Sequence, residues 1–303
     1  MFKICAIIFA LTSICFPQQT SIIKQESLTD GEKIVHLSRG AVGLEKQKFE
    51  SVQYKVKTLL LTKTPSGRAM PDFFSEISLI LPEKIQAVYS RGEPFPYIST
   101  KTWNGEKYKS FFEMEFMGEK TIKDDTNADR DSGKSKDYGI LEGKIAKDKL
   151  AVLKNAKRLD PKEVLSESMW TELFPLILTH PFEKDVKFNY VGKAKANNVT
   201  ANVVDFKPKN GKSYRLLFDA ETNYLLMMIV KYKRNDAFFV GDVETKYYFS
   251  NRELAGDVLI PKTIKVEHKQ TAPGQPAKIG YSNVDIVEFK LNPQFKESLF
   301  EIK

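Results

Sequence analysis

The sequence predicts an α+β protein, an antiparallel, incompletely closed β-barrel (half-barrel) with an N-terminal helix and a mid-chain helical lid. Three observations lead to this prediction. Apolar and polar residues alternate before residue 119 and after residue 187, which is typical of half-buried strands. Helical patterns are confined to one segment near the N-terminus and one in the middle of the chain. Short turns join consecutive strands, which favours antiparallel pairing.

An uncharged run from Ile4 to Phe16 follows a single lysine and precedes polar residues. Its length and position are typical of a cleaved signal peptide, and it is too short to cross a bilayer comfortably. We therefore expect residues 1–20 to be a signal peptide and residues 28–303 to form one exported domain. An uncleaved membrane anchor is the less favoured alternative. The bulky Ile14 before Cys15 argues against a lipid-modified cysteine.

Composition narrows the class of protein further. Both cysteines lie inside the predicted signal peptide, so the mature chain holds no thiol, and its three histidines are far apart in sequence. These facts argue against a metal site of His and Cys ligands. The formal net charge of +8 is spread along the chain. Because an exported protein does not meet nucleic acid, an anionic membrane surface or an envelope protein is the better partner for this charge. We expect a monomer without cofactors.

The N-terminal part begins with a helix and continues as strands. Apolar residues recur at three- and four-residue steps between Thr29 and Leu44, and Thr29-Asp30 supplies a cap. Gly40 and Gly43 indicate that the chain leaves the helix there. From Ser51 the period changes to two. Further strands are predicted at Phe73–Leu81, Lys84–Ser90, Ile98–Trp103 and Lys107–Met117, with Asn104-Gly105 as a hairpin turn.

The middle of the chain changes character twice. The stretch 119–143 is rich in Asp, Lys, Ser and Gly, which predicts a charged loop or linker. Helical patterns follow at Lys147–Leu159 and again from Pro161, where Asp160 is a suitable cap. The second run extends to Leu178 and is apolar around most of its circumference, so it must be covered on more than one side. Pro175 predicts a kink near its end.

From Lys187 onward the pattern predicts a series of antiparallel strands. One of them, Tyr224–Val230, is apolar on both faces. Such a strand must be covered on both sides, by core, by a helix or by a ligand.

Several short motifs, in this order, resemble the LolA-like superfamily of periplasmic lipoprotein and lipid carriers. The resemblance covers residues 28–303. Its motifs are Trp103-Asn104-Gly105-Glu106-Lys107, Leu217-Phe218-Asp219-Ala220-Glu221-Thr222-Asn223-Tyr224-Leu225, Gly256-Asp257-Val258-Leu259-Ile260-Pro261 and the closing Leu299-Phe300. It implies a half-barrel fold, a periplasmic location in a bacterium, and a lipid or a lipidated protein as partner.

Aromatic residues make up 12% of the chain, and methionines are interleaved with them. Such side chains adapt to flexible acyl chains. We therefore predict a hydrophobic cavity between the sheet and the lid, and a non-enzymatic protein that carries or binds lipid, acyl chains or lipidated protein. The predicted cavity residues are Phe112, Met114, Met169, Trp170, Phe174, Tyr214, Leu216, Phe218, Leu226 and Met228. An envelope interaction or sensing module on the same fold is the alternative.

Two further hypotheses involve acidic residues. Glu113 and Glu115 lie on the same face of a predicted strand, and two carboxylates can hydrolyse a glycosidic bond. A solvated outer face explains the same pair. Acidic residues from Asp125 follow calcium-loop spacing, but Arg130 and Lys136 stand where glycine and glutamate are required. The chain has no Gly-x-Ser-x-Gly motif, so nucleophilic catalysis is not favoured.

Overall fold

The structure is a computed structural model, and it describes residues 28–45, 47–61, 72–81, 84–92, 96–104, 107–116, 119–126, 169–179, 185–196, 198–235 and 239–302. The predicted signal peptide lies outside these residues. So do the helix predicted at Lys147–Leu159 and the first part of the helix predicted from Pro161.

Helix α1 (Asp30–Ala41) begins where the sequence predicts it. Thr29 is the N-cap. Its hydroxyl accepts a hydrogen bond from the Glu32 amide (3.3 Å), and the Glu32 carboxylate accepts one from the Thr29 amide (2.8 Å). This capping box satisfies two amides that a helix start leaves without partners. The chain leaves the helix through Gly43, whose φ of +81° is left-handed.

Within the described residues, thirteen strands form one antiparallel sheet. They are β1 (Ser51–Leu60), β2 (Phe73–Ile80), β3 (Lys84–Arg91), β4 (Tyr97–Asn104), β5 (Tyr108–Phe116), β6 (Glu119–Thr126), β7 (Asn189–Ala196), β8 (Val199–Phe206), β9 (Ser213–Asp219), β10 (Leu225–Asn235), β11 (Val240–Ala255), β12 (Val258–Thr271) and β13 (Lys278–Leu291). The order across the sheet is β6-β5-β4-β3-β2-β1-β13-β12-β11-β10-β9-β8-β7. Among the described strands, β6 and β7 are therefore the two edges, and they do not pair with each other to close a barrel.

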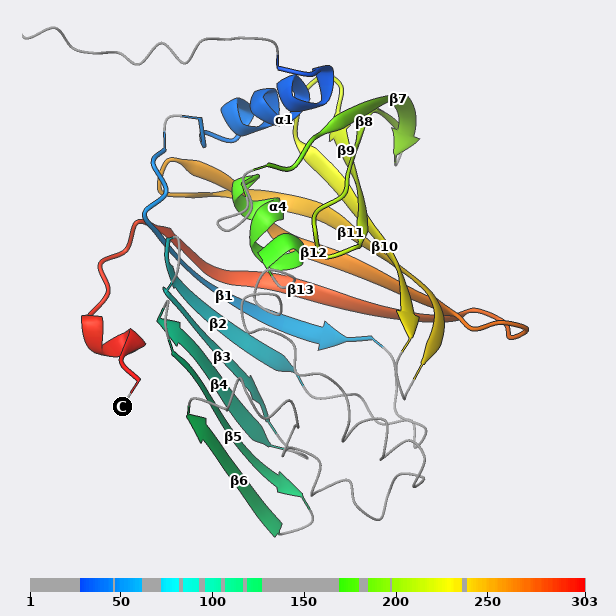
Figure 1. Ribbon diagram of the computed structural model, residues 1–303. Helices are drawn as coiled ribbons and strands as arrows, with labels where there is room; N and C mark the ends of the chain where they lie inside the picture. Colours follow the sequence, from blue (N-terminus) through cyan, green and yellow to red (C-terminus); the bar gives the residue numbers. More distant parts are fainter. Residues whose placement is uncertain are drawn as a thin grey trace, which may run out of the picture.

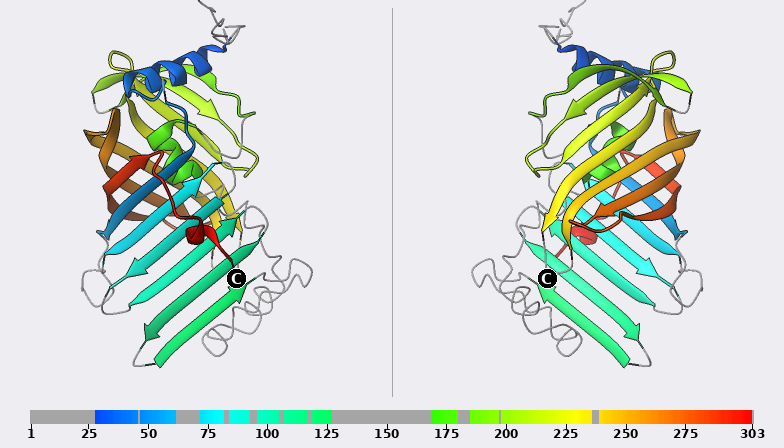
Figure 2. Two further views of the ribbon diagram at one scale, coloured as in Figure 1. Left: turned by 90° about the vertical axis from the view of Figure 1, so that its left-hand side faces the viewer. Right: turned by 90° about the vertical axis from the view of Figure 1, so that its right-hand side faces the viewer.

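The sheet curves around a mid-chain helical segment, which consists of the π-helical turn η2 (Met169–Leu173) and the short helix α4 (Phe174–Ile177) (Figure 1). This segment lies on the concave side of the sheet, and α1 crosses one end of the sheet beside β7 and β8 (Figure 2). The C-terminal 3₁₀ helix η3 (Glu297–Phe300) packs against the other side, where the Gln86 side chain donates a hydrogen bond to the Leu299 carbonyl (2.8 Å). The predicted open half-barrel with an N-terminal helix is confirmed.

The four strands predicted between Phe73 and Met117 are present, each within one residue at both ends. The prediction of a charged loop over 119–143 is wrong at its start, because 119–126 form β6, paired with β5. β6 is an edge strand, and an edge strand tolerates charged side chains that a central strand would not. The remainder of that stretch lies outside the described residues. Strand β11 continues to Ala255, so only Gly256 and Asp257 separate it from β12.

The main hydrophobic core lies between the concave face and the mid-chain helical segment. Strands β1 to β4 and β8 to β13 contribute alternate side chains to it, and α1 contributes Val35. A smaller cluster lies on the convex side of β7 to β10, where Ala196, Ala201, Val203 and Leu217 are buried. β10 is thus covered on both faces, as its apolar pattern predicts.

Candidate ligand-binding face

The mid-chain helical segment packs an aromatic block against the concave face. The Trp170 ring lies 5.0 Å from Phe174, 5.1 Å from Phe206 and 6.0 Å from Tyr214, measured between ring centroids. Phe206 and Tyr214 stack at 4.8 Å. Trp170, Phe174 and Tyr214 each keep only 1% of their surface exposed. The tilted geometry is the arrangement that aromatic rings prefer, and the block closes this end of the half-barrel.

The structure brings seven of the ten predicted cavity residues together in this core. Those seven are Met169, Trp170, Phe174, Tyr214, Leu216, Phe218 and Met228. Leu226 is not among them, because β10 carries a register irregularity between Leu225 and Met227 and Leu226 packs with the convex cluster instead. Strict alternation predicts Leu226 on the face of Met228, and the irregularity places it on the opposite face.

Phe112 and Met114 lie elsewhere on the concave face, on β5. Phe73, Tyr97 and Phe112 form a row across β2, β4 and β5, with ring centroids 6.4 Å and 6.0 Å apart. Met114 pairs with Tyr97 in the strand register. We call Phe73, Tyr97, Phe112 and Met114 the aromatic row. All four are partly exposed, in contrast to the block under α4.

A polar contact connects the mid-chain helical segment to the sheet. The Tyr54 hydroxyl of β1 donates a hydrogen bond to Glu172 Oε2 of η2 at 3.3 Å. Burial raises the pKa of Glu172 to about 7, although the hydrogen bond from Tyr54 acts in the opposite direction. Burial, and then the negative charge of Glu172, raise the pKa of Tyr54 well above its usual range. A carboxyl group that is half-protonated near neutral pH therefore lies where the helical segment meets the sheet.

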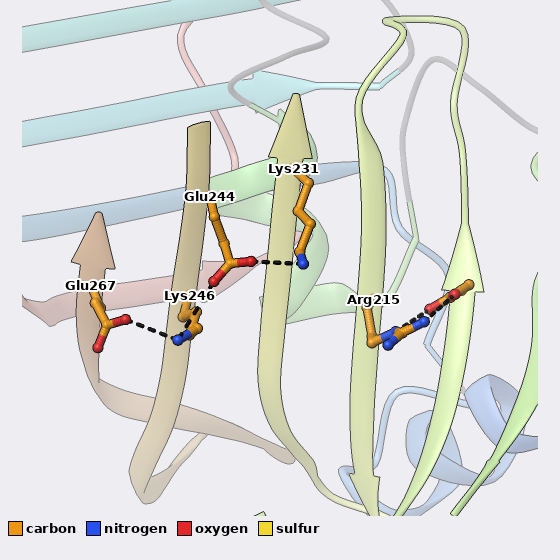
Figure 3. A network of polar contacts seen from close by, with 6 residues as sticks. Arg215, Lys231, Glu244, Lys246 and Glu267 are labelled. Atoms are coloured by element: carbon orange, nitrogen blue, oxygen red, sulfur yellow. Dashed lines mark hydrogen bonds and ion pairs between the residues drawn. The ribbon is translucent and has the colours of Figure 1, made fainter. Parts of the chain in front are cut away.

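The convex face of β8 to β12 carries ion pairs. Figure 3 shows Lys231 of β10 beside Glu244 of β11 (2.7 Å), and Lys246 of β11 between Glu244 (3.5 Å) and Glu267 of β12 (2.9 Å). Arg215 pairs in the same way with Asp205 of the neighbouring strand. Lys231–Glu244, Lys246–Glu267 and Arg215–Asp205 are cross-strand pairs, whereas Lys246 and Glu244 lie on the same strand. The spread of lysines in the sequence predicts such a face.

The carboxylate pair of the hydrolase hypothesis lies on the convex side of β5. Glu113 forms an ion pair with Lys120 of β6 at 2.7 Å, and Glu115 is exposed. Neither faces the concave side, so the outer-face interpretation fits the pair. Within the described residues, no group of three His, Cys, Asp or Glu side chains could hold a metal ion. In the same part of the chain, no helix is both long enough and apolar enough to cross a membrane.

His268 has a structural setting. Its ring nitrogens lie 2.9 Å from the Thr245 hydroxyl and 3.0 Å from the Gln270 side-chain nitrogen. Burial, and then the positive charge of Arg234, lower its pKa. The His268 imidazole is therefore hydrogen-bonded through both ring nitrogens, and its lowered pKa favours the neutral form.

Fold and concave face together define an open antiparallel half-barrel with an apolar inner surface and a helical segment inside it. No family model matches the sequence. No curated protein matches it either. The structure is similar to that of a DUF1329 family protein from Desulfovibrio piger, at 10% identity over 90% of this chain and 98% of that chain, with a TM-score of 0.45. It is also similar to a putative outer membrane lipoprotein-sorting protein domain from Vibrio parahaemolyticus, at 10% identity over 89% and 97% of the two chains, with a TM-score of 0.43.

A third similar structure is the MucA/MucB complex of Pseudomonas aeruginosa, at 8% identity over 88% and 100% of the two chains, with a TM-score of 0.19. The strand order and the position of the helices carry the assignment of the fold.

Two features of the concave face escape sequence reasoning. The aromatic row depends on which strands are neighbours. Phe73 begins one predicted strand and Tyr97 directly precedes another, and no pattern in the sequence distinguishes either residue. The Tyr54–Glu172 contact joins residues 118 positions apart. The one sequence signal for it is that Glu172 is the only charged residue between Met169 and Leu178.

Proposed function

We propose that this protein is an exported, non-catalytic carrier or binder of lipid, acyl chains or lipidated protein, with the apolar ligand held on the concave face beside the mid-chain helical segment. The observation that carries the proposal is that one part of the concave face is buried and another part is partly exposed. The block under α4 is packed, whereas the aromatic row is partly exposed and faces the interior of the half-barrel.

Acyl chains suit such a surface because methionine and aromatic side chains adapt to flexible apolar ligands, and each buried methylene contributes about 0.8 kcal/mol. Burial of Trp170 and Phe174 in the core gives the ligand a closed wall at one end. Across β10 to β12 the convex face carries the ion pairs Lys231–Glu244 and Lys246–Glu267. The proposed binding residues therefore lie along the aromatic row, and the predicted Phe112 and Met114 are among them.

Adjacent phenylalanines on β2 provide a matched test. Phe73 lies on the concave face in the aromatic row, and Phe74 lies on the convex face with 45% of its surface exposed. We expect Phe73→Ser to weaken the binding of an environment-sensitive fatty-acid probe by at least about fivefold, since it removes most of one ring contact. Phe74→Ser should leave probe binding unchanged.

Native mass spectrometry of the purified protein gives an independent measurement, because a carrier retains a co-purifying apolar ligand. If the wild type carries no ligand and ignores the probe, the carrier function is wrong. The envelope interaction module then becomes the better function. Equal effects of Phe73→Ser and Phe74→Ser would show that the probe binds outside the concave face.

A further inference from the structure

One end of the sheet concentrates positive charge. The β8–β9, β10–β11 and β12–β13 connections all lie at this end, because the strands alternate in direction. The described segments here are 207–213, 231–235, 240–244 and 269–278, and they hold eight Lys or Arg residues but two acidic residues. We call this end the hairpin-tip surface.

The opposite end lacks this excess of positive charge. The β7–β8, β9–β10 and β11–β12 connections lie there, and the described residues of segments 193–199, 219–225 and 252–258 hold four Asp or Glu residues and three Lys or Arg residues. The charge of the described residues on this side of the sheet is therefore polarised along the strands. A polarised charge of this kind orients a protein in the field of a charged surface.

Charge at the hairpin-tip surface is only partly neutralised within the protein. Lys231 is paired with Glu244 at 2.7 Å. Among the described residues, Lys207, Lys233 and Lys278 are exposed and form no ion pair. Their positive charge is available to an external anion.

Exposed apolar side chains lie beside these cations. Val240 at the start of β11 is 54% exposed, and Ile279 and Tyr281 at the start of β13 are 48% and 49% exposed. Leu61 follows β1, is 51% exposed, and its amide donates a hydrogen bond to the Tyr281 carbonyl. The β12–β13 hairpin that carries Ile279 projects beyond the neighbouring strands (Figure 1).

Two hollows lie at the same end. One, of about 420 Å³, is lined by Lys231, Lys233 and Lys269 together with Asp242 and Glu244. The other, of about 510 Å³, is lined by Arg234, Val240 and Lys278 among other residues. Lysine and arginine in a shallow hollow suit a phosphate group, with which they form charge-assisted hydrogen bonds.

We propose that the hairpin-tip surface docks on a membrane that contains anionic phospholipids, with the cations at the headgroups and the exposed apolar side chains at the boundary with the acyl chains. Cations attract the negative surface, and apolar side chains beside them gain from insertion. An acidic protein would satisfy the cations, but it would leave Val240 and Ile279 without apolar partners. This inference does not depend on the proposed carrier function.

Co-sedimentation with vesicles tests the proposal. The vesicles are made of pure phosphatidylcholine or of an equimolar mixture of phosphatidylcholine and phosphatidylglycerol. We expect binding to the mixed vesicles only, and weaker binding as salt is raised. Lys233→Glu with Lys278→Glu should lower the partition coefficient by at least about tenfold, since each Lys near an anionic surface contributes measurably to binding.

The matched control is Lys84→Glu with Lys107→Glu, which changes the net charge equally at exposed positions far from the hairpin-tip surface. It should change the partition coefficient by less than about twofold if docking is local. Val240→Ser with Ile279→Ser tests insertion and should weaken binding without changing its salt dependence. Circular dichroism confirms the fold of each variant.

Equal losses in the tip and control variants, or equal binding to both vesicle types, would overturn the proposal. So would a wild type that ignores both vesicle types. Retention on immobilised poly-glutamate under the same conditions would then assign the surface to an acidic protein partner.

Discussion

Glu172 is an acidic residue whose side chain is buried where the helical segment packs on the sheet. It lies between Trp170 and Phe174, two of the most buried rings in the protein, and its carboxyl group meets the sheet through Tyr54. A protonated carboxyl group can remain there at little cost, whereas a carboxylate is disfavoured by the loss of water.

The free energy of unfolding should therefore depend on pH through Glu172. Its pKa is about 7 in the folded state and 4.5 ordinarily, so the folded state binds the proton more tightly. Stability falls as pH rises from about 4.5 to about 7 and then levels off, and the total loss is at most roughly 3 kcal/mol. Glu172→Gln should remove this fall, which urea unfolding at pH 5 and pH 8 measures.

Tyr54→Phe is the informative companion variant. The hydrogen bond from Tyr54 lowers the Glu172 pKa, so its removal should extend the loss of stability to higher pH. Tyr89 also raises the pKa of Tyr54, and it is unchanged in both Glu172→Gln and Tyr54→Phe. Parallel pH profiles for the wild type and Glu172→Gln would show that the carboxyl group is solvated in the folded protein.

The burial of individual residues is the part of the site that sequence predicts least well. Trp170 and Phe174 of the helical segment lie in one core with Met228 of the sheet, but whether such residues line a cavity or a packed core depends on neighbouring rings. Phe206 fills the space between Trp170 and Tyr214, and it had no place among the predicted cavity residues. Such packing is decided by strand order, which alternation does not reveal.

At the scale of elements, the strands and α1 follow closely from local patterns. The capping residues fix the start of α1, and alternation fixes β2 to β5 to within one residue. β6 is missed because its side chains are mostly polar, and an edge strand is held by backbone hydrogen bonds on one side. The irregularity in β10 is missed because an extra residue leaves no mark in the apolar pattern.

The turn after α1 gives a prediction at this scale. Gly43 has a φ of +81°, and a Cβ built on it would lie 2.5 Å from the Asp257 carbonyl oxygen. The Leu259 amide donates a hydrogen bond to the Val42 carbonyl at 3.0 Å, so the turn is tied to β12. Gly43→Ala should therefore destabilise the protein by about 1–3 kcal/mol, through backbone strain and displacement of this contact.

Gly211→Ala is the matched control for this variant. Gly211 also has a left-handed φ, of +77°, but nothing lies within 4 Å of a Cβ built there. The difference in thermal midpoint between the two variants isolates the contact with Asp257 from the backbone strain that both share. Equal midpoints would show that the turn relaxes freely.

At the scale of the whole molecule, β1 and β13, the first and last described strands in chain order, are neighbours in the sheet. β1 pairs with β13 from Val52–Leu291 to Leu60–Ser282, which joins two strand blocks that lie on either side of the mid-chain region. The sequence predicts both blocks and their antiparallel turns, but local patterns hold no information on a pairing between residues so far apart. The order of the blocks, and their resemblance to a half-barrel family, supplied that information instead.

This shared sheet predicts cooperative unfolding of the region from 28 to 303 as one domain. The chain has two tryptophans, Trp103 in the N-terminal strand block and Trp170 in the mid-chain helical segment that packs on the C-terminal block. Trp103→Phe and Trp170→Phe each leave one fluorescent reporter. Because β1 and β13 are paired and both tryptophans belong to one core, the two variants should each show a single transition in which fluorescence and far-ultraviolet circular dichroism coincide. If Trp103 and Trp170 instead report separate transitions, with circular dichroism following their sum, the two strand blocks are independent domains and the β1–β13 pairing does not couple them.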